Sequence, residues 1–354
     1  MTISMRESER IAAVDEAWIS RAQAHLDVLT KPLGSLGRLE ELAARVVAIQ
    51  QSTSPSVDRK AVFIFAADHG VTAEGVSAYP SAVTEQMVLN FLRGGAAINV
   101  LARAAGAEVH VIDVGVDAQV EHPGFKSRKV RRGTRNFLYE PALSSEEVRS
   151  ALGVGAEIAE EAHARGLQIV ALGEMGIGNT TAASAITAAL TGQSAALVTG
   201  VGTGITGATF DRKKSVVDGA MALHFPDRAG LSPAPLEVLR CVGGLEIAAM
   251  CGFVLAAARH RMAVVLDGFI ATSAAALAFS MEPAVRGYLF AGHLSQERGH
   301  RYLLELIGLR PLLDLAMRLG EGSGAVLALG IIESAVRVYN EMATFDSAGV
   351  SKAL

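Results

Sequence analysis

Residues 167–182, LQIVALGEMGIGNTTA, place an apolar strand, a glycine-rich turn and the start of an alanine-rich helix in immediate succession. The strand is predicted over residues 169–172 and the turn over 173–178, and the helix begins at Asn179. Glycines let backbone N–H groups approach a ligand, and the unpaired N–H groups at a helix start favour negative charge. We therefore predict an anion-binding site in this turn, with the carboxylate of Glu174 inside it.

Short apolar runs of the same kind recur along the chain and alternate with helical patterns. Strands are predicted at residues 61–67, 108–112, 169–172, 262–266 and 288–291. Strands that alternate with helices are typical of a mostly parallel sheet that helices cover on both faces. The sequence therefore predicts an α/β, Rossmann-like fold.

A polar residue stands at the predicted carboxyl end of each strand, in or beside a glycine turn. These residues are Asp68, Asp113, Glu174, Asp267 and His293. In open α/β sheets, ligands bind in the crevice at the carboxyl ends of the strands. We therefore expect the five side chains to share one rim of the sheet and to form a functional site there.

The remaining segments show recognisable helix and loop signals. Helices are predicted at residues 83–105 (interrupted at Gly94-Gly95), at 145–165, at 235–260, and from 311 onward, broken only at 319–324. Ser144 and Glu147 form a capping box at the start of the second of these helices. Residues 1–52 are helical in pattern, and the Ser/Pro-rich residues 52–56 predict a linker between them and the sheet. The polar, patchily basic residues 117–143 predict an exposed excursion.

Composition excludes several classes of partner for this chain of 354 residues. Lys and Arg number 32 against 36 Asp and Glu, and no basic stripe with interleaved aromatics indicates a nucleic-acid partner. The N-terminus lacks the apolar core of a signal peptide, and the longest apolar runs fall short of the roughly 18–20 residues of a membrane span. Cys241 and Cys251 lie in an apolar stretch and predict buried thiols in a reducing compartment. We therefore expect a soluble, cytoplasmic protein.

Residues 202–207, GTGITG, match the GxGxxG pattern of dinucleotide-binding proteins. That pattern is specific only directly after a strand and with an acidic residue at the end of the next strand. The flanking residues here do not fit, so an NAD-dependent oxidoreductase is disfavoured, and a backbone contact to phosphate with charge from Lys213 fits better. Asn179 and Thr180 also stand where a Walker lysine would follow the 173–178 turn, which disfavours ATP chemistry.

The pair Asp68-His69 invites a metal interpretation, but no HExxH motif or carboxylate-rich helix accompanies it. His293 and His300 are also candidates, yet the glycine turn around His293 means that helical spacing does not align them. We expect a structural or polar-network role for these side chains and no metal site.

Glu321 stands in a glycine-flanked break, LGEGSG, between two helical stretches. A solvated loop glutamate is the ordinary alternative, but small and apolar neighbours predict a packed loop. Partial burial there raises the pKa of a carboxyl toward neutrality, as a general base requires. Glu321 is therefore a candidate general base.

Seven motifs, in order from about residue 30 to 340, together resemble the nicotinate-nucleotide:dimethylbenzimidazole phosphoribosyltransferase family. They are KPLGSLGRLE (31–40), FAADHGV (65–71), SAYPSAVTEQM (77–87), GEMGIGNTT (173–181), DGFI (267–270), GHLSQERGH (292–300) and LGEGSGA (319–325). The resemblance implies transfer of phosphoribose from nicotinate mononucleotide to 5,6-dimethylbenzimidazole. The products would be nicotinate and α-ribazole 5'-phosphate for the nucleotide loop of cobalamin. It also implies a homodimer that needs no metal or cofactor.

The resemblance implies a small helical domain, residues 1–55 plus 311–354, and an α/β domain, residues 56–310. It makes Glu321 the catalytic base. The benzimidazole-binding residues would be Pro80, Ser81, Gln86, Glu174, Met175, Leu319 and Gly320. The nucleotide- and phosphate-binding residues would be Gly176, Gly178, Asn179, Thr180, Gly202, Gly204, Lys213, Asp267, Gly268 and Phe269, with Lys214 as the alternative lysine. A nucleotide- or azole-binding sensor without catalysis would keep the glycine turns but not the base, so the presence of Glu321 argues against it.

Overall fold

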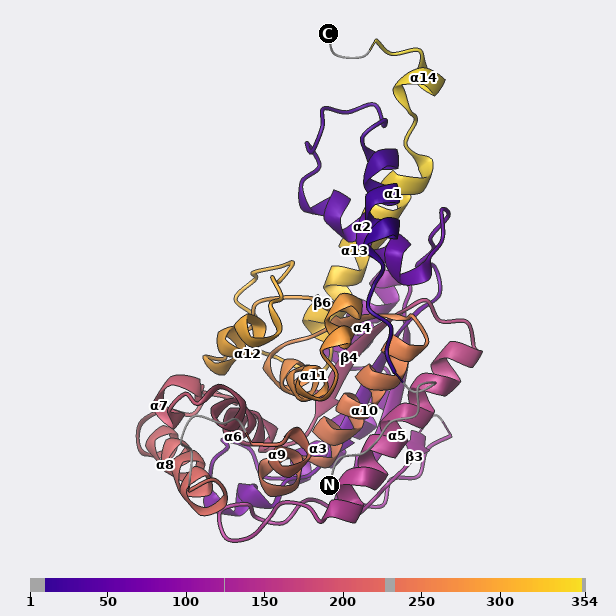
Figure 1. Ribbon diagram of the computed structural model, residues 1–354. Helices are drawn as coiled ribbons and strands as arrows, with labels where there is room; N and C mark the ends of the chain where they lie inside the picture. The colour runs from indigo at the N-terminus through magenta and orange to yellow at the C-terminus, as the bar shows by residue number, and fades with distance from the viewer. Residues whose placement is uncertain (1–9, 124, 227–232, 352–354) are drawn as a thin grey trace.

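The computed structural model describes residues 10–123, 125–226 and 233–351. In this part of the chain, six parallel strands form one sheet in the order β3-β2-β1-β4-β5-β6 (Figure 1). The strands are β1 (Lys60–Ala67), β2 (Glu108–Gly115), β3 (Phe125–Ser127), β4 (Ile169–Met175), β5 (Ala263–Leu266) and β6 (Leu289–Ala291). The predicted parallel α/β sheet is confirmed.

Helices and short 3₁₀ turns fill the connections. They are α1 (Glu16–Leu26), α2 (Arg38–Gln50), η2 (Gly70–Glu74), α3 (Ala82–Leu92), α4 (Ala97–Ala105), α5 (Ser145–Ala164), α6 (Asn179–Thr191), α7 (Ala195–Val198), α8 (Gly207–His224), α9 (Pro235–Val242), α10 (Leu245–Arg259), α11 (Phe269–Met281), η3 (Pro283–Tyr288), α12 (Gly299–Ile307), α13 (Ser323–Glu341) and α14 (Phe345–Ala348). The capping box predicted for α5 is present, because the Ser144 hydroxyl accepts from the Glu147 N–H and the Glu147 carboxylate accepts from the Ser144 N–H. The glycines at 94–95 separate α3 from α4, as predicted.

Apolar side chains on both faces of β1 explain its place in the middle of the sheet. Every residue of β1 is buried. The rings of Phe63 and Phe65 contact Phe253 of α10, with centroid distances of 5.1 and 5.8 Å. Val62 points to the opposite face, because successive strand residues alternate, and lies beneath Gly322 at the start of α13. Helices therefore cover both faces, as the apolar strand pattern requires.

Two predicted helical stretches are wrong in detail. Residues 235–260 form two helices, α9 and α10, that part at Gly243-Gly244. A Cβ atom at position 244 would lie 2.4 Å from a ring carbon of His69, so the backbone packs directly on that imidazole. Residues 311–318 are not helical, because the N–H groups of Leu312 and Leu313 bond the backbone oxygens of residues 291 and 292 and extend the edge of β6.

Two strand predictions also need correction. Strand β4 continues to Met175, so Glu174 lies in the strand, opposite Phe65 of β1, and not in the turn. Strand β3 lies within the expected excursion, residues 117–143, and adds an edge to the sheet. Its three residues are too short a segment to show the alternating or continuous apolar pattern by which a strand is predicted.

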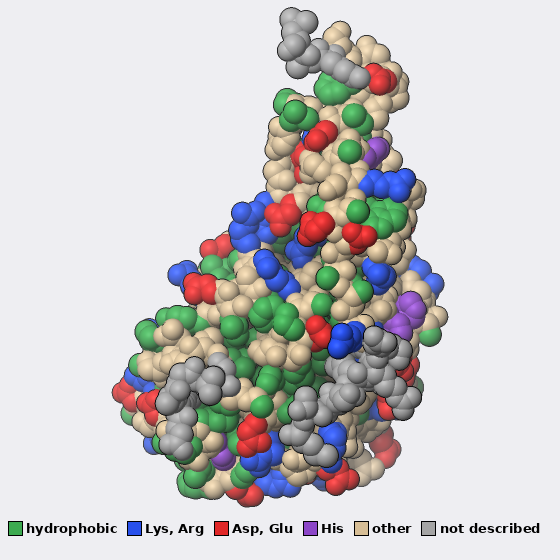
Figure 2. Space-filling view, in the orientation of Figure 1, with side chains coloured by type: hydrophobic (Ala, Val, Ile, Leu, Met, Phe, Trp, Pro, Cys, Tyr) green, Lys and Arg blue, Asp and Glu red, His purple; other side chains and the backbone are tan. Residues whose placement is uncertain are grey.

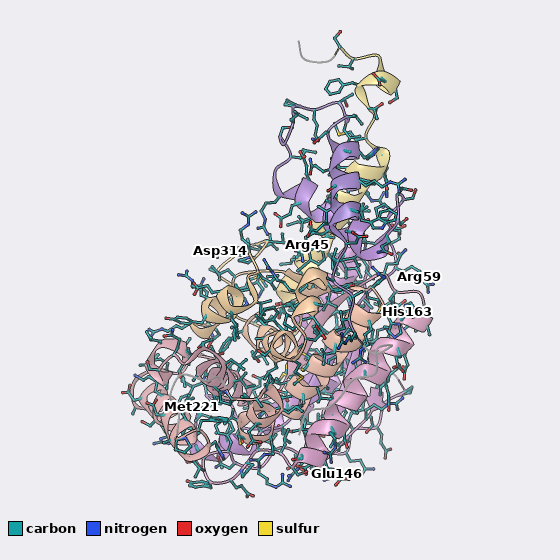
Figure 3. The ribbon with its side chains drawn as sticks, viewed as in Figure 1. Arg45, Arg59, Glu146, His163, Met221 and Asp314 are labelled. Carbon is teal, nitrogen blue, oxygen red and sulfur yellow. The ribbon has the colours of Figure 1, made fainter. Side chains whose placement is uncertain are left out.

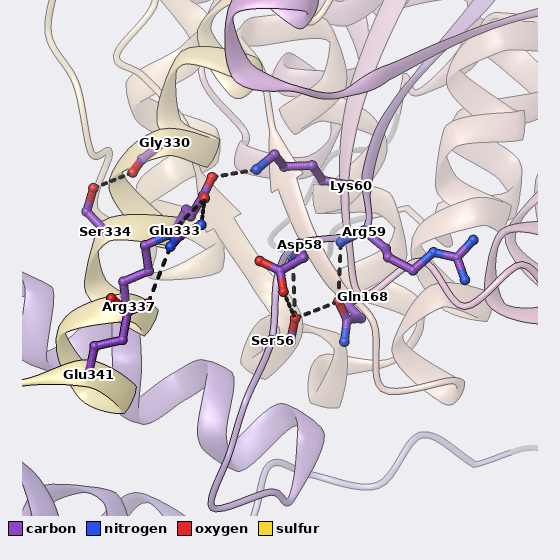
Figure 4. Close-up of polar contacts among 10 residues, drawn as sticks. All are labelled: Ser56, Asp58, Arg59, Lys60, Gln168, Gly330, Glu333, Ser334, Arg337 and Glu341. Carbon is purple, nitrogen blue, oxygen red and sulfur yellow. Dashed lines mark hydrogen bonds and ion pairs between the residues drawn. The ribbon is translucent and has the colours of Figure 1, made fainter.

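The two chain ends form a helical lobe beside the sheet. Helix α2 packs against α1 and α13, and Figure 1 shows α1, α2 and the C-terminal part of α13 projecting together from the α/β body. Arg45 of α2 lies where the lobe meets the body (Figure 3), and its Nη2 donates to the backbone oxygen of Leu289 at 2.6 Å. Lys60 at the start of β1 pairs with Glu333 of α13 at 2.5 Å (Figure 4). These contacts fasten the lobe to the sheet.

Acidic and basic side chains are interspersed over the face seen in Figure 2, as the near-balanced charge predicts. Within the described ranges, no helix combines the length and the apolar character that a membrane crossing needs. Cys241 and Cys251 are buried free thiols, as predicted.

Candidate active site

The carboxyl ends of β4 and β5 open into a cavity of about 710 Å³. Its wall is completed by α3 with the segment before it, the turn before α8, the segment after β6 and the loop before α13. Among the predicted site residues, the cavity is lined by Glu174, Met175, Gly176, Gly178, Asn179, Thr180, Gly202, Asp267, Gly268, Phe269, Leu319, Gly320 and Glu321. The structure therefore brings together residues that lie far apart in the sequence.

Three of the five strand-end residues reach this cavity: Glu174, Asp267 and His293. The expectation for the other two is wrong. Asp68 instead accepts a hydrogen bond from the N–H of residue 117 at 2.8 Å, and Asp113 accepts one from residue 116 at 2.8 Å. One oxygen of each carboxylate therefore helps to hold the loop that follows β2, and neither residue lines the cavity.

Glu174 is a buried carboxyl in the cavity floor. Its Oε2 accepts a hydrogen bond from Nδ2 of Asn179, the first residue of α6. Burial, together with the nearby carboxylates of Asp267, Glu246 and Glu321, raises the pKa of Glu174 to about 8. Glu174 is therefore mostly protonated and uncharged at neutral pH.

Glu321 lies in a tight loop between two glycines. Gly320, Glu321 and Gly322 have φ angles of +87°, +64° and +91°, so the backbone is left-handed at three successive residues. Only 6% of Glu321 is exposed, and burial raises the pKa of its carboxyl above the ordinary value. Its Oε2 accepts from the N–H of Ile98 in the first turn of α4 at 3.3 Å. The predicted packed loop and raised pKa are confirmed.

Lys213 lies behind the Gly202 turn and does not line the cavity. Its Nζ donates to the Thr180 hydroxyl at 2.8 Å and to the backbone oxygen of Gly200 at 3.3 Å. Burial lowers the pKa of Lys213 to about 8. Lys214, the alternative, instead pairs with Asp211 at 2.7 Å. Both lysines lie in α8, which begins at residue 207.

Arg318 and Glu297 are cavity residues that sequence reasoning missed. Nη1 of Arg318 donates to the backbone oxygen of Gly202 at 2.8 Å, and Oε1 of Glu297 accepts from the N–H of the same residue at 2.8 Å. The turn is thus held from both sides. The sequence offered one signal, since Arg318 stands in the same loop as Glu321, three positions before it.

Part of the cavity wall comes from α3 and the residues before it. Ser77, Tyr79, Val83 and Met87 line the cavity. Val83 and Met87 are one helical turn apart and so share a face. Pro80, Ser81 and Gln86 belong to the same segment but are not among the residues of the cavity wall, and neither is Gly204 of the other turn. The helical period of α3 was the signal that would have identified Val83 and Met87.

His69 and His300, which were considered as metal ligands, form buried polar contacts. Nε2 of His69 lies 2.7 Å from Oε1 of Glu246. Nδ1 of His300 accepts from the N–H of Ser295, and its Nε2 lies 2.9 Å from the Thr272 hydroxyl. These contacts fit the expected polar-network role. The GxGxxG match at 202–207 follows helix α7 instead of a strand, so it lacks the context of a dinucleotide site.

Comparison with known proteins gives one consistent result. The sequence model of a phosphoribosyltransferase family matches residues 11–350. The chain is 52% identical over 353 residues to the nicotinate-nucleotide--dimethylbenzimidazole phosphoribosyltransferase of Geobacter sulfurreducens, with 99% of each chain covered. It is 51% identical over 342 residues to the enzyme of the same name from Chlorobaculum tepidum, with 96% of each chain covered. The crystal structure of the Thermus thermophilus enzyme superposes with a TM-score of 0.89 at 50% identity, over 96% of this chain and 100% of that one.

Proposed function

The chain belongs to the nicotinate-nucleotide--dimethylbenzimidazole phosphoribosyltransferase family and is a phosphoribosyltransferase of cobalamin lower-ligand assembly, and we propose that Glu321 is the general base of its reaction. The proposed substrates are nicotinate mononucleotide and 5,6-dimethylbenzimidazole, which the names of the relatives support. The proposed products are α-ribazole 5'-phosphate and nicotinate.

The chemistry of the transfer places modest demands on the protein. Nicotinate is bound to the ribose as a pyridinium, so it leaves with the bonding electrons and needs no proton donor. The anomeric carbon becomes oxocarbenium-like, and nearby carboxylates stabilise it. One azole nitrogen forms the new bond from the opposite face, and the other nitrogen gives its proton to a base. One general base therefore suffices for the proton transfer.

The observation that carries the proposal is the buried carboxylate of Glu321 at the edge of the cavity. A base is most effective when its pKa lies near the working pH, and burial raises the pKa of Glu321 in that direction. Leu319 and Met175 also line the cavity and offer an apolar surface for an azole ring. The glycine turn at 176–178, just before α6, offers backbone N–H groups for a phosphate, whereas the N–H of Gly202 already donates to Glu297.

The other site residues take proposed roles toward these two substrates. The azole side comprises Glu174, Met175, Leu319 and Gly320, together with the segment that contains Pro80, Ser81 and Gln86. The nucleotide side comprises Gly176, Gly178, Asn179, Thr180, Gly202, Gly204, Lys213, Gly268 and Phe269. We add Arg318 to the nucleotide side, because its guanidinium lies beside the Gly202 turn in the cavity wall. Glu174, with a pKa of about 8, is largely protonated at neutral pH and is therefore not the proposed base.

The assembly and the domain division are also proposals. We propose a homodimer, the assembly that the resemblance to this family implies. The division into residues 1–55 plus 311–354 and residues 56–310 draws support from the packing of α2 on α13. A cytoplasmic location fits the two free thiols.

Release of nicotinate from nicotinate mononucleotide, with and without dimethylbenzimidazole, tests the proposal. We expect azole-dependent release, and a fall in kcat of roughly 100- to 10,000-fold in Glu321→Gln with substrate binding kept. Equal rates in the two proteins would leave the enzyme class in place but move the base elsewhere, Glu174 being next. Binding without any release would instead favour the sensor.

A further inference from the structure

The first turn of α13 is capped from outside by Asp267, the residue that follows β5. Its Oδ1 accepts hydrogen bonds from the N–H groups of Gly324 and Ala325 at 2.7 and 3.1 Å. Its Oδ2 accepts from the N–H of Gly322 at 3.1 Å. The first N–H groups of a helix lack partners within the helix, and a carboxylate near them is stabilising. Gly322 precedes α13 and has no side chain that could cap it, so the cap comes from Asp267.

The helix start that Asp267 caps is continuous with the loop that carries Glu321. Residue 321 is the only non-glycine among the three successive left-handed residues 320–322. Such a backbone is unfavourable for a residue with a side chain and persists only where the surrounding structure enforces it. The N–H of Gly322 immediately follows Glu321 in the chain. Its hydrogen bond to Asp267 is therefore the one of the three that lies closest to Glu321 and most directly holds the backbone of that residue in place.

Asp267 has little capacity left for a substrate. Only 1% of the residue is exposed, and both carboxylate oxygens already accept backbone hydrogen bonds. Nε2 of His293, a side chain that is equally buried, lies 3.5 Å from Oδ1. A ribose hydroxyl would have to displace backbone N–H groups from the carboxylate. Those N–H groups have no other partner at the helix end, so losing this bond would be costly.

We infer that Asp267 is a positioning residue that fixes the Glu321 carboxylate in the cavity by holding the first turn of α13, and is not a ligand of the ribose. The inference rests on the proposed role of Glu321 as the base. It assigns to Asp267 a task different from the ribose contact that the family resemblance implies.

A double-mutant cycle separates the two roles. With Asp267→Asn, we expect kcat to fall roughly 10- to 100-fold, because small displacements of a catalytic group are costly. Binding of nicotinate mononucleotide, measured by calorimetry, should change less than about threefold. In a Glu321→Gln background the same substitution should add less than about threefold to the loss, since coupled residues are not additive.

Two outcomes overturn the inference. One is a tenfold weakening of nucleotide binding by Asp267→Asn. The other is that Asp267→Asn lowers kcat by the same factor in the wild-type protein and in the Glu321→Gln variant. A wild-type rate for Glu321→Gln alone refutes the assignment of the base, which is a separate failure. The acidic limb of the pH–rate profile gives a further readout. It should move to lower pH in Asp267→Asn, because the Asp267 charge contributes to the raised pKa of Glu321.

Asp113→Asn is the matched control. Asp113 is also a buried aspartate at a strand end, and it accepts a backbone N–H bond, but it lies outside the cavity wall. We expect this variant to lose thermal stability and to keep its kcat. If Asp113→Asn and Asp267→Asn lower kcat to a similar extent, the effect of Asp267→Asn comes from general destabilisation, and the inference is overturned.

If Asp267→Asn does not fold, the wild-type chain still decides the question. With ¹⁵N-glycine labelling, we expect the amide protons of Gly322 and Gly324 to be protected from exchange, because both bond to the carboxylate. Their protection should survive saturation with nicotinate mononucleotide. Loss of protection on nucleotide binding would mean that the carboxylate turns toward the ribose, and would overturn the inference.

Discussion

The backbone of Glu321 crosses β4 directly over Gly173. A Cβ atom at position 173 would lie 2.3 Å from the backbone oxygen of Glu321 and 2.6 Å from the nitrogen of Gly322. Real Cβ atoms do not approach backbone so closely, so the glycine in the strand is what lets the loop of the proposed base reach the cavity.

Gly173→Ala should therefore displace the loop and lower kcat by roughly 100-fold, because a shift of about 1 Å can cost that much. Steady-state kinetics with circular dichroism to verify folding are the measurement. Gly153→Ala is the control, since position 153 lies in α5 with open space around a Cβ atom. That variant should be fully active and slightly stabilised, by about 0.5–1 kcal/mol. An active Gly173→Ala would show that the loop tolerates displacement.

The fold could be predicted from the sequence because its strands are apolar on both faces and end in glycine turns. β1 and β4 illustrate this, since both are buried on two sides and so form continuous apolar runs. The 311–318 segment could not be predicted, because its extended form depends on the free edge of β6. A sequence pattern carries no information on which strand edge is left unpaired.

The site was predicted where chemistry is local and missed where it depends on packing. Glu174 and Glu321 stand in distinctive glycine-flanked motifs, and both reach the cavity. Arg318 was missed because its relevance comes from a hydrogen bond to Gly202, which is distant in the sequence. The expectation for Asp68 was wrong, because a strand-end position does not reveal that the side chain bonds the loop after β2 and lies outside the cavity wall.

The rate should fall at acidic pH as Glu321 becomes protonated. Burial raises the pKa of this carboxyl, and a general base acts only in the deprotonated form, so the acidic limb should lie above the ordinary glutamate pKa. The measurement is kcat/KM for the azole between about pH 4.5 and 8 at saturating nucleotide. Glu321→Gln should remove the limb, and persistence of the limb in this variant would point to another titrating group.

Glu174 should make the protein less stable as pH rises. Its folded pKa of about 8 lies above the ordinary value of 4.5. The stabilisation relative to the unfolded chain is complete below the unfolded pKa and is lost as the pH rises through the folded pKa. We therefore expect Tm to fall between about pH 5 and 8, and to fall less in Glu174→Gln. Glu305→Gln, on the exposed surface of α12, should keep the wild-type dependence.

Arg318→Gln should weaken nucleotide binding more than catalysis. A charged donor beside the Gly202 turn is expected to contribute about 1.5–3 kcal/mol to phosphate binding, so KM for nicotinate mononucleotide should rise at least tenfold. Arg310→Gln is the control, because Arg310 is exposed and pairs with Glu41 outside the cavity. If the two variants have the same KM, Arg318 does not contact the phosphate.

Nucleotide binding should weaken at alkaline pH as Lys213 loses its proton. Burial lowers its pKa to about 8, so its charge is lost as pH rises through that value, and the field behind the Gly202 turn weakens. A Cβ atom at position 202 would lie 2.8 Å from its Nζ, which places the charge directly beneath the turn. We therefore expect KM for nicotinate mononucleotide to increase above about pH 8.

Lys213→Met should abolish this pH dependence and raise KM at every pH, because it removes both the charge and the hydrogen bonds to Thr180 and Gly200. Lys214→Met is the adjacent control. Lys214 pairs with Asp211 and lies over the ring of Phe210, away from the turn, so this variant should keep the wild-type KM and its pH dependence. If the rise in KM at high pH is abolished by Lys214→Met instead, the phosphate lies on the outer face of α8. No backbone N–H group of the turn could reach it there, so the nucleotide would have a different orientation in the cavity.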